Sequence, residues 1–255
     1  MAVAYRSSNS QSMSGDPWSY TSPPSGTAEN DILLAWLNLD ANVSTVDSVP
    51  SGWTQIDTAD AGDGDIRSYL YWKRAGASEA GPYSWGLTAA ENGMIAMGAY
   101  SGCVTSGDPQ DVAGDVVGTA ASTTTHTSGS IVTSTADCLI VCLAATDLSA
   151  TSTPQWSNWT NSAQERLDAE SANFVEVGLA DYTKASPGST SFSVDSAVAD
   201  SGCVGIVALK PAATVELQAF RPDADTAEGG WTTAPLWSKV EEEAADATII
   251  TATAS

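Results

Sequence analysis

The sequence contains an internal repeat, and this feature constrains the fold more than any other. Residues 19–54 align with residues 125–160 at a constant offset of 106, and about 10 of these 36 positions are identical. Trp53 aligns with Trp159 and Asp31 with Asp137, so these four residues are expected to belong to the scaffold. With small gaps the similarity extends to Gly81–Trp85 with Gly188–Phe192, and to Gly93–Tyr100 with Gly202–Leu209. A repeat this long suits half of a large β-sandwich, or one small sandwich, rather than a solenoid unit.

Local patterns predict β-strands, because the apolar runs are short and are bounded by Gly, Pro, Asp and Asn. Helix signals are almost absent. Two runs, Ile32–Leu37 and Leu139–Leu143, are continuously apolar, which indicates strands packed on both faces. The Thr-rich stretch Thr119–Gly129 is interpreted as an extended edge strand that links the halves. The predicted strands are Ile32–Leu39, Thr54–Thr58, Asp65–Lys73, Tyr83–Leu87, Gly93–Tyr100, Cys138–Thr146, Asn161–Arg166, Phe174–Tyr182, Ser189–Val194 and Cys203–Leu209.

The predicted fold is all-β: one antiparallel β-sandwich, jelly-roll-like, built from two related halves. The sandwich is expected to span residues 1–212, with halves of about 1–106 and 107–212. The alternative is that each half forms its own sandwich; the apolar runs shared by both halves favour a joint core. Residues 213–255 show no third copy of the repeat and are too few to bury a core alone. They are therefore predicted to form an extended arm for intersubunit contacts, through Phe220, Trp231, Trp237, Ile249 and Ile250.

The net charge restricts the classes of partner. Thirty-one acidic residues face nine basic ones, for a net charge of -22. Phosphate contacts require Lys and Arg, so nucleic-acid binding is excluded and an anionic membrane surface is disfavoured. The acidic surface is interpreted as a source of solubility, with a high-salt host as the alternative. No run of 18 apolar residues predicts a membrane span, and the N-terminus does not resemble a signal peptide, so synthesis in a cytosol is expected.

The sequence lacks recognisable catalytic motifs, so we expect a protein that is not an enzyme and has no cofactor. The only histidine, His126, lies in the Thr-rich stretch and is interpreted as a solvated linker residue. No nucleophile elbow, phosphate loop or pair of metal-binding histidines is present. The weak metal candidate is Asp60, Asp63 and Asp65, since close carboxylates on a Gly-containing loop suit calcium. Their spacing fails the EF-hand pattern, and an ordinary Asp/Gly turn is the preferred interpretation.

The four cysteines are expected to act as small buried hydrophobes. Cys138 and Cys142 share one strand and would lie about 13 Å apart, too far for a disulfide. A bridge between Cys103 and Cys203, at equivalent ends of the halves, stays open as an alternative.

The nine tryptophans allow two interpretations. Exposed Trp on a β-sandwich could stack on sugars, which would make the protein a carbohydrate-binding module. The competing role is packing in the core or at an interface, where Trp contributes a large apolar area. Recurrence at equivalent sites favours the packing role for Trp53 and Trp159, whereas Trp231 and Trp237 are interpreted as contact residues.

Several segments resemble those of a known class of protein. Pro50-Ser-Gly-Trp-Thr54, the strand Tyr69-Leu-Tyr-Trp-Lys73, Tyr83-Ser-Trp85 and the ending Val207-Ala-Leu-Lys-Pro211 are similar to a β-sandwich module of tailed-phage virion proteins and bacterial surface proteins. Leu217 to Trp237, with Arg-Pro-Asp and Gly-Trp-Thr, resembles a segment that accompanies such modules. The first resemblance covers about 1–212 and the second 213–255. Neither carries a catalytic motif.

The resemblance implies a structural protein of a tailed-phage virion, made in the host cytoplasm. The leading expectation is an outer capsid decoration or cement protein. It would bind the major capsid protein or another virion protein and form a homo-oligomer, by analogy a trimer. The alternative is a head- or tail-fibre module that recognises host surface glycans.

Overall fold

A computed structural model describes residues 2–40, 44–62, 64–147, 156–171 and 175–213. The chain divides into two units, Met1–Thr214 and Val215–Ser255, and the second lies outside the described residues. The described elements are β1 (Ala4–Gly15), β2 (Trp18–Tyr20), β3 (Ile32–Leu39), β4 (Val46–Ser48), β5 (Thr54–Asp60), β6 (Arg67–Arg74), β7 (Tyr83–Leu87), β8 (Glu91–Ser101), β9 (Asp115–Thr127), β10 (Ile131–Thr133), β11 (Cys138–Asp147), η1 (Thr160–Ser162), β12 (Gln164–Glu170), β13 (Val175–Lys184), β14 (Gly188–Thr190) and β15 (Ser193–Leu209).

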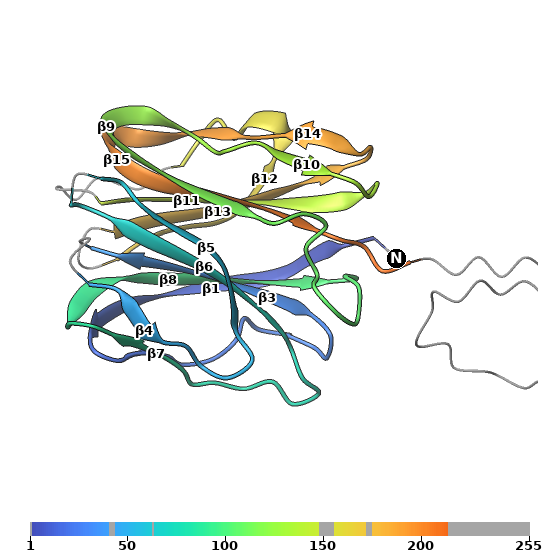
Figure 1. Ribbon diagram of the computed structural model, residues 1–255, viewed down its shortest axis with the longest axis horizontal. Coiled ribbons are helices and arrows are strands. Elements are labelled where there is room, and N and C mark those ends of the chain that lie inside the picture. The colour runs from blue at the N-terminus through green and yellow to red at the C-terminus, as the bar shows by residue number, and fades with distance from the viewer. Residues whose placement is uncertain (1, 41–43, 63, 148–155, 172–174, 214–255) are drawn as a thin grey trace, which may run out of the picture. The chain divides into compact units, whose positions relative to one another are not determined.

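Two five-stranded antiparallel sheets form the centre of the first unit (Figure 1). The first large sheet has the strand order β1-β8-β3-β6-β5, and the second large sheet has the order β9-β15-β11-β13-β12. If the five strands of each sheet are numbered in their order along the chain, both sheets have the same spatial order of strands. The remaining strands form two small sheets, with the orders β2-β7-β4 and β10-β14. The predicted all-β class with antiparallel sheets is therefore confirmed.

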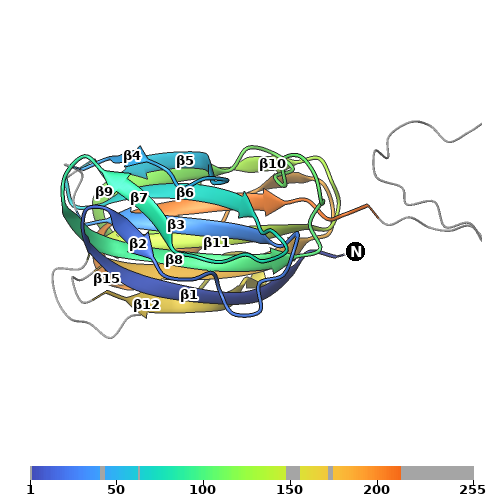
Figure 2. The same cartoon turned by 90° about the horizontal axis from the view of Figure 1, so that it is seen from below.

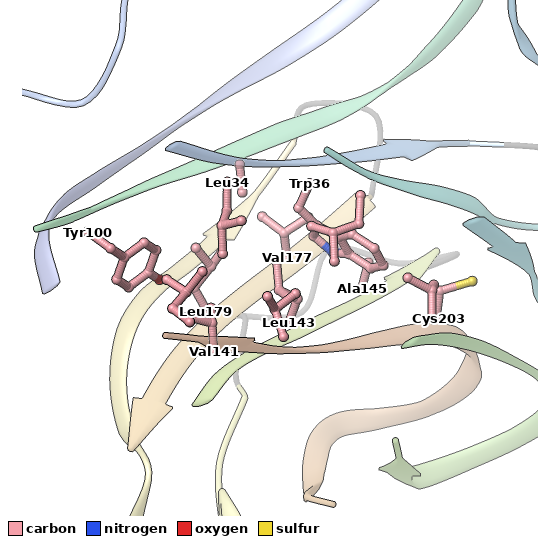
Figure 3. Packing of buried hydrophobic residues seen from close by; sticks show 14 of the residues in the cluster. Leu34, Trp36, Tyr100, Val141, Leu143, Ala145, Val177, Leu179 and Cys203 are labelled. Carbon is pink, nitrogen blue, oxygen red and sulfur yellow. The ribbon is translucent and has the colours of Figure 1, made fainter. Parts of the chain in front are cut away.

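The large sheets face each other across one apolar cluster, here called the central core (Figure 3). Alternate residues of β3, among them Ile32, Leu34 and Trp36, point into it from the first sheet. Alternate residues of β11, among them Leu139 and Leu143, point into it from the second. Successive side chains of a strand point to opposite faces of its sheet. β3 and β11 therefore each contribute side chains to two apolar clusters, one on each face. Their continuously apolar sequences predict this arrangement.

Each small sheet covers the outer face of one large sheet. In the first half, Trp18, Tyr83 and Trp85 of β2 and β7 pack on the other face of β3, in a cluster here called the first outer core. Figure 2 shows β2 and β7 in front of β3 and β8. In the second half, Ile131 and Phe192 belong to a second outer core that also contains Trp156. The four sheets thus form layers separated by three apolar clusters.

The edges of the large sheets approach each other. At one edge the N–H of Val116 on β9 donates to Asp57 Oδ2 on β5 at 2.9 Å. Nearby, a Cβ on Gly118 would lie 1.9 Å from the carbonyl oxygen of Asp60, so only glycine allows this approach. At the other edge, the Arg166 guanidinium of β12 lies 4.6 Å from the centre of the Tyr5 ring on β1. These contacts protect edge strands that could otherwise pair with other chains.

Most of the predicted strands and the predicted edge strand are found, with shifts of a few residues at their ends. Two predictions are less accurate: β15 begins at Ser193, ten residues before the predicted Cys203, and the predicted strand Ser189–Val194 is divided between β14 and the start of β15. β1 was not predicted, because its side chains are mostly Ser, Asn and Gln. Nor were the short strands β2, β4 and β10. These four strands have weak apolar patterns, and their pairing partners lie far away in the chain.

The predicted offset of 106 is wrong by one residue in the central strands. Leu39 pairs with Gly93 in the first sheet and Thr146 pairs with Gly202 in the second, so Leu39 corresponds to Thr146. Asp31 and Asp137 are therefore not equivalent. Asp31 is buried and forms an ion pair with Arg6 at 2.6 Å, whereas Asp137 is exposed and has a φ of 58°. The residue that matches Asp137 is Asn30, with a φ of 68°.

Candidate functional site

The predicted metal candidates do not form a cation site within the described residues. The carboxylate of Asp60 pairs with Arg67 at 3.0 Å, and Asp65 Oδ2 accepts a hydrogen bond from the Ser201 hydroxyl at 3.3 Å. Asp63 lies outside the described residues. In the described part of the chain, no group of three or more His, Cys, Asp or Glu side chains could hold a metal ion. The predicted partner-binding residues also lie outside it: Phe220, Trp231, Trp237, Ile249 and Ile250.

The described tryptophans are packing residues. Trp53 contacts Trp85 with ring centres 5.4 Å apart, and Trp159 contacts Phe192 at 5.7 Å. All seven Trp side chains in the described ranges are buried or partly buried, so these ranges offer no exposed Trp on which a sugar could stack. Four cysteines, Cys103, Cys138, Cys142 and Cys203, are buried and form no disulfide. Burial raises the pKa of each of the first three thiols.

His126 is not the solvated linker residue that its polar neighbours predict. The side chain is 1% exposed and lies on β9, against the Trp156 ring at 5.7 Å in an edge-to-face arrangement. A Cβ on Gly202 would lie 2.9 Å from His126 Nδ1, so the glycine makes room for the imidazole. In the first half, Trp18 covers Gly93 in the same way. His126 therefore covers Gly202 as Trp18 covers Gly93. The local sequence around His126 does not indicate that it is buried.

Further polar groups lie on the outer face of the second large sheet. Thr146 is the cross-strand partner of both Gly202 and Glu176, so the three lie in one row on the outer face. Asp168 Oδ2 accepts a hydrogen bond from the Trp156 N–H at 3.3 Å, and burial raises the pKa of Asp168 to about 6. Leu39, the counterpart of Thr146, belongs to the first outer core, which is apolar. Matching places in the two large sheets therefore differ in chemistry.

A second polar group lies where the two large sheets meet. We call it the carboxyl seam; it consists of Asp40, Asp65, Glu91, Asp147 and Asp200. Asp40 directly follows β3, and Asp147 ends β11, so the two central strands bring one carboxyl group each to the same end of the sheets. The Ser201 hydroxyl on β15 donates to Asp65 Oδ2 in the loop before β6, a strand of the first large sheet. The side chains of Asp40 and Asp147 are hydrogen-bonded to each other.

A hydrogen bond between two carboxyl groups requires one proton, which the pair must share. Burial is the largest cause that raises the pKa of Asp147 to about 7, and the charges of Asp40, Asp200 and Asp65 add to it. Burial also raises the pKa of Asp40, with a contribution from Glu91. The two carboxyl groups therefore hold one proton as a pair. The seam can therefore take up or release a proton near neutral pH.

Two open hollows lie at the opposite end of the strands. One, of about 590 Å³, is lined mainly by small apolar groups together with Lys210, Asp137 and Thr183. The other, of about 380 Å³, lies beside Arg6 and Asp31. Ala212 and Ala213 line both. These hollows are wide and shallow, and they hold no concentration of reactive side chains.

Comparison with known proteins adds no relative: no family model, no curated protein and no solved structure matches this chain. The described residues also form no helix of the length and hydrophobicity that a membrane crossing requires.

Proposed function

We propose that the protein is a structural part of a tailed-phage virion, made in the host cytoplasm, and that it decorates and stabilises the outer surface of the capsid. The resemblance of residues 1–212 and 213–255 to virion modules supports this class. The proposal assigns the protein no catalysis, no cofactor and no nucleic-acid partner. Its partners would be the major capsid protein or another virion protein, and further copies of the same chain.

We also propose that the fold is a duplicated jelly roll. In a jelly roll of eight strands, the first pairs with the eighth, the second with the seventh and the third with the sixth. The pairs β1-β8, β2-β7 and β3-β6 follow this rule, and β9-β15, β10-β14 and β11-β13 repeat it. The shared strand order supports two related halves. The central core, which takes residues from both large sheets, supports their assembly into a single domain.

The observation that carries the proposal is that the described chain uses its large and charged side chains to build a closed scaffold. Among the described residues, five of the seven Lys and Arg side chains bond to a carboxylate or carbonyl of the same chain: Arg6, Arg67, Lys73, Arg74 and Arg166. Within these ranges, the exposed large hydrophobic residues are Val49, Val132 and Val198. A rigid acidic exterior of this kind suits a protein exposed on a particle surface, away from the packaged DNA.

The test is the amount and effect of the protein in purified particles. We expect a fixed ratio of copies to the major capsid protein, and heads stripped of the protein should lose thermal stability that readdition restores. Immunogold labelling would separate a head position from a tail position. Stripped heads with full thermal stability would contradict the cement role, and labelling confined to the tail would contradict the capsid position.

The arm proposal has its own test. Deletion of Val215–Ser255 is expected to abolish oligomer formation and leave the first unit folded, because the central core and both outer cores are built from residues before this segment. Analytical ultracentrifugation reports assembly and circular dichroism reports the fold. If the truncated protein still forms the same oligomer, the arm is not required for assembly and the proposal is wrong.

A further inference from the structure

The second outer core is closed by a short segment, here called the Trp156 segment (residues 156–162), which is attached to β15 by polar bonds. Ser157 and Asp195 exchange two backbone hydrogen bonds of 2.8 and 2.9 Å. The Asn158 side chain donates to Asp195 Oδ2 at 2.9 Å, and Thr160 Oγ1 accepts from the Ser193 N–H at 2.8 Å. Beneath these bonds, the Trp156 ring packs on His126.

The hydrogen bonds of Ser196 determine which nitrogen of His126 carries the proton. Ser196 has a single hydroxyl hydrogen, and its oxygen lies 2.7 Å from the carbonyl oxygen of Val198, which accepts that hydrogen. The contact of 3.3 Å between Ser196 Oγ and His126 Nε2 is then made with Nε2–H donating. Nδ1 is left with its lone pair, and it finds no hydrogen-bond partner among the described residues.

Protonation of Nδ1 would create a charged donor at an atom for which no acceptor of the described residues lies within hydrogen-bonding distance. The charged and polar groups on the neighbouring elements are Asp195 on β15, Asp168 on β12, Glu176 on β13 and Thr146 on β11. Asp195 raises the pKa of His126, but burial has the larger effect and lowers it. Neutral imidazole is therefore the form that fits beneath Trp156.

We propose that His126 is a proton-sensitive latch, which holds the Trp156 segment closed while neutral and releases it when the imidazole takes up a proton. Release would uncover Trp156, Trp159 and Phe192 together. The first half has no such device, because Trp18 occupies the matching place and its indole N–H donates to the carbonyl oxygen of Glu91 at 3.1 Å. The latch does not depend on the proposed role in a virion.

The sign of the pH dependence follows from the lowered pKa. The folded form binds the proton less tightly than the released form, so closure is fully stable above the ordinary histidine value of 6.5. Below that pH, the equilibrium constant for opening rises by about tenfold per pH unit until the folded-state pKa is reached.

The experiment uses the full chain and its single histidine. Histidine NMR should report a pKa below the ordinary value, and hydrogen exchange should show protection of the Trp156 segment falling as the pH falls below 6.5, after correction for intrinsic rates. His126→Phe keeps a ring that cannot titrate and should lose this pH-dependent opening. His126→Gln, which keeps a donor for Ser196, should lose it as well if the Phe variant folds poorly.

Asp168→Asn is the control, since Asp168 has a pKa of about 6, within the same pH range, and contacts Trp156. The opening should persist in this variant. The latch is refuted by a histidine pKa at or above 6.5 in the wild type. It is equally refuted by opening that is unchanged in both His126 variants, or that disappears in Asp168→Asn while persisting in them.

Discussion

Replacing Trp36 by alanine is expected to lower the free energy of unfolding by about 3–5 kcal/mol. Trp36 is fully buried on β3, and its ring spans the central core: Cζ3 lies 3.5 Å from the position that a Cβ on Gly205 of β15 would occupy. Its removal leaves a cavity between the two large sheets that neither sheet can fill alone. Urea unfolding followed by circular dichroism measures the loss.

Trp72→Ala is the matched control, since Trp72 is only partly buried and packs at the margin of the same core. Its effect should be clearly smaller. The wild type and Trp36→Ala should each unfold in one transition, because both halves share the central core. Two separate transitions in the wild type, with Trp36→Ala moving only one, would favour two independent sandwiches.

Replacing Asp147 by asparagine is expected to stabilise the protein at pH 8 by on the order of 2 kcal/mol and to have little effect at about pH 4. The pKa of Asp147 is raised in the folded state from 3.8 to about 7, so the folded protein holds this proton more tightly than the unfolded chain. The wild type should therefore lose stability as the pH rises from about 4 to 7 and change little above that range. Asparagine mimics the protonated acid and removes this dependence. Urea unfolding at a series of pH values measures the difference.

Asp137→Asn is the control for charge, because it also removes one negative charge but lies on an exposed turn at the other end of β11. Asparagine tolerates the positive φ of that position. It should leave the pH dependence unchanged. If Asp147→Asn and the wild type show the same pH profile, the shared proton between Asp40 and Asp147 does not contribute to stability.

The sequence predicted the strands with apolar patterns and missed those without them. β3 and β11 are recognisable because both of their faces are buried, which makes most of their residues apolar. β1 has one polar face and few apolar residues on the other, so its place beside β8 depends on contacts almost a hundred residues away. The alignment offset differs by one residue for a related reason. The identity of Asp31 and Asp137 favoured an offset of 106, although alternation places the two residues on different faces of their strands.

The candidate sites were less predictable than the fold. The carboxyl seam joins residues from the ends of β3 and β11 and from two loops, and no local motif links them. The prediction for His126 was wrong because the groups that bury it come from segments distant in sequence, among them Trp156 and Gly202.

By itself, the sequence determined the β class, the internal repeat and the acidic exterior, because composition and alternation are properties of the chain alone. The folded structure alone shows which strands pair, that the two large sheets share one core, that His126 is buried, and that the carboxyl seam comes together. The physical reason is that burial and pKa depend on groups brought together from distant parts of the chain. Two halves with similar sequences can therefore place a tryptophan in one copy and a titratable histidine in the other.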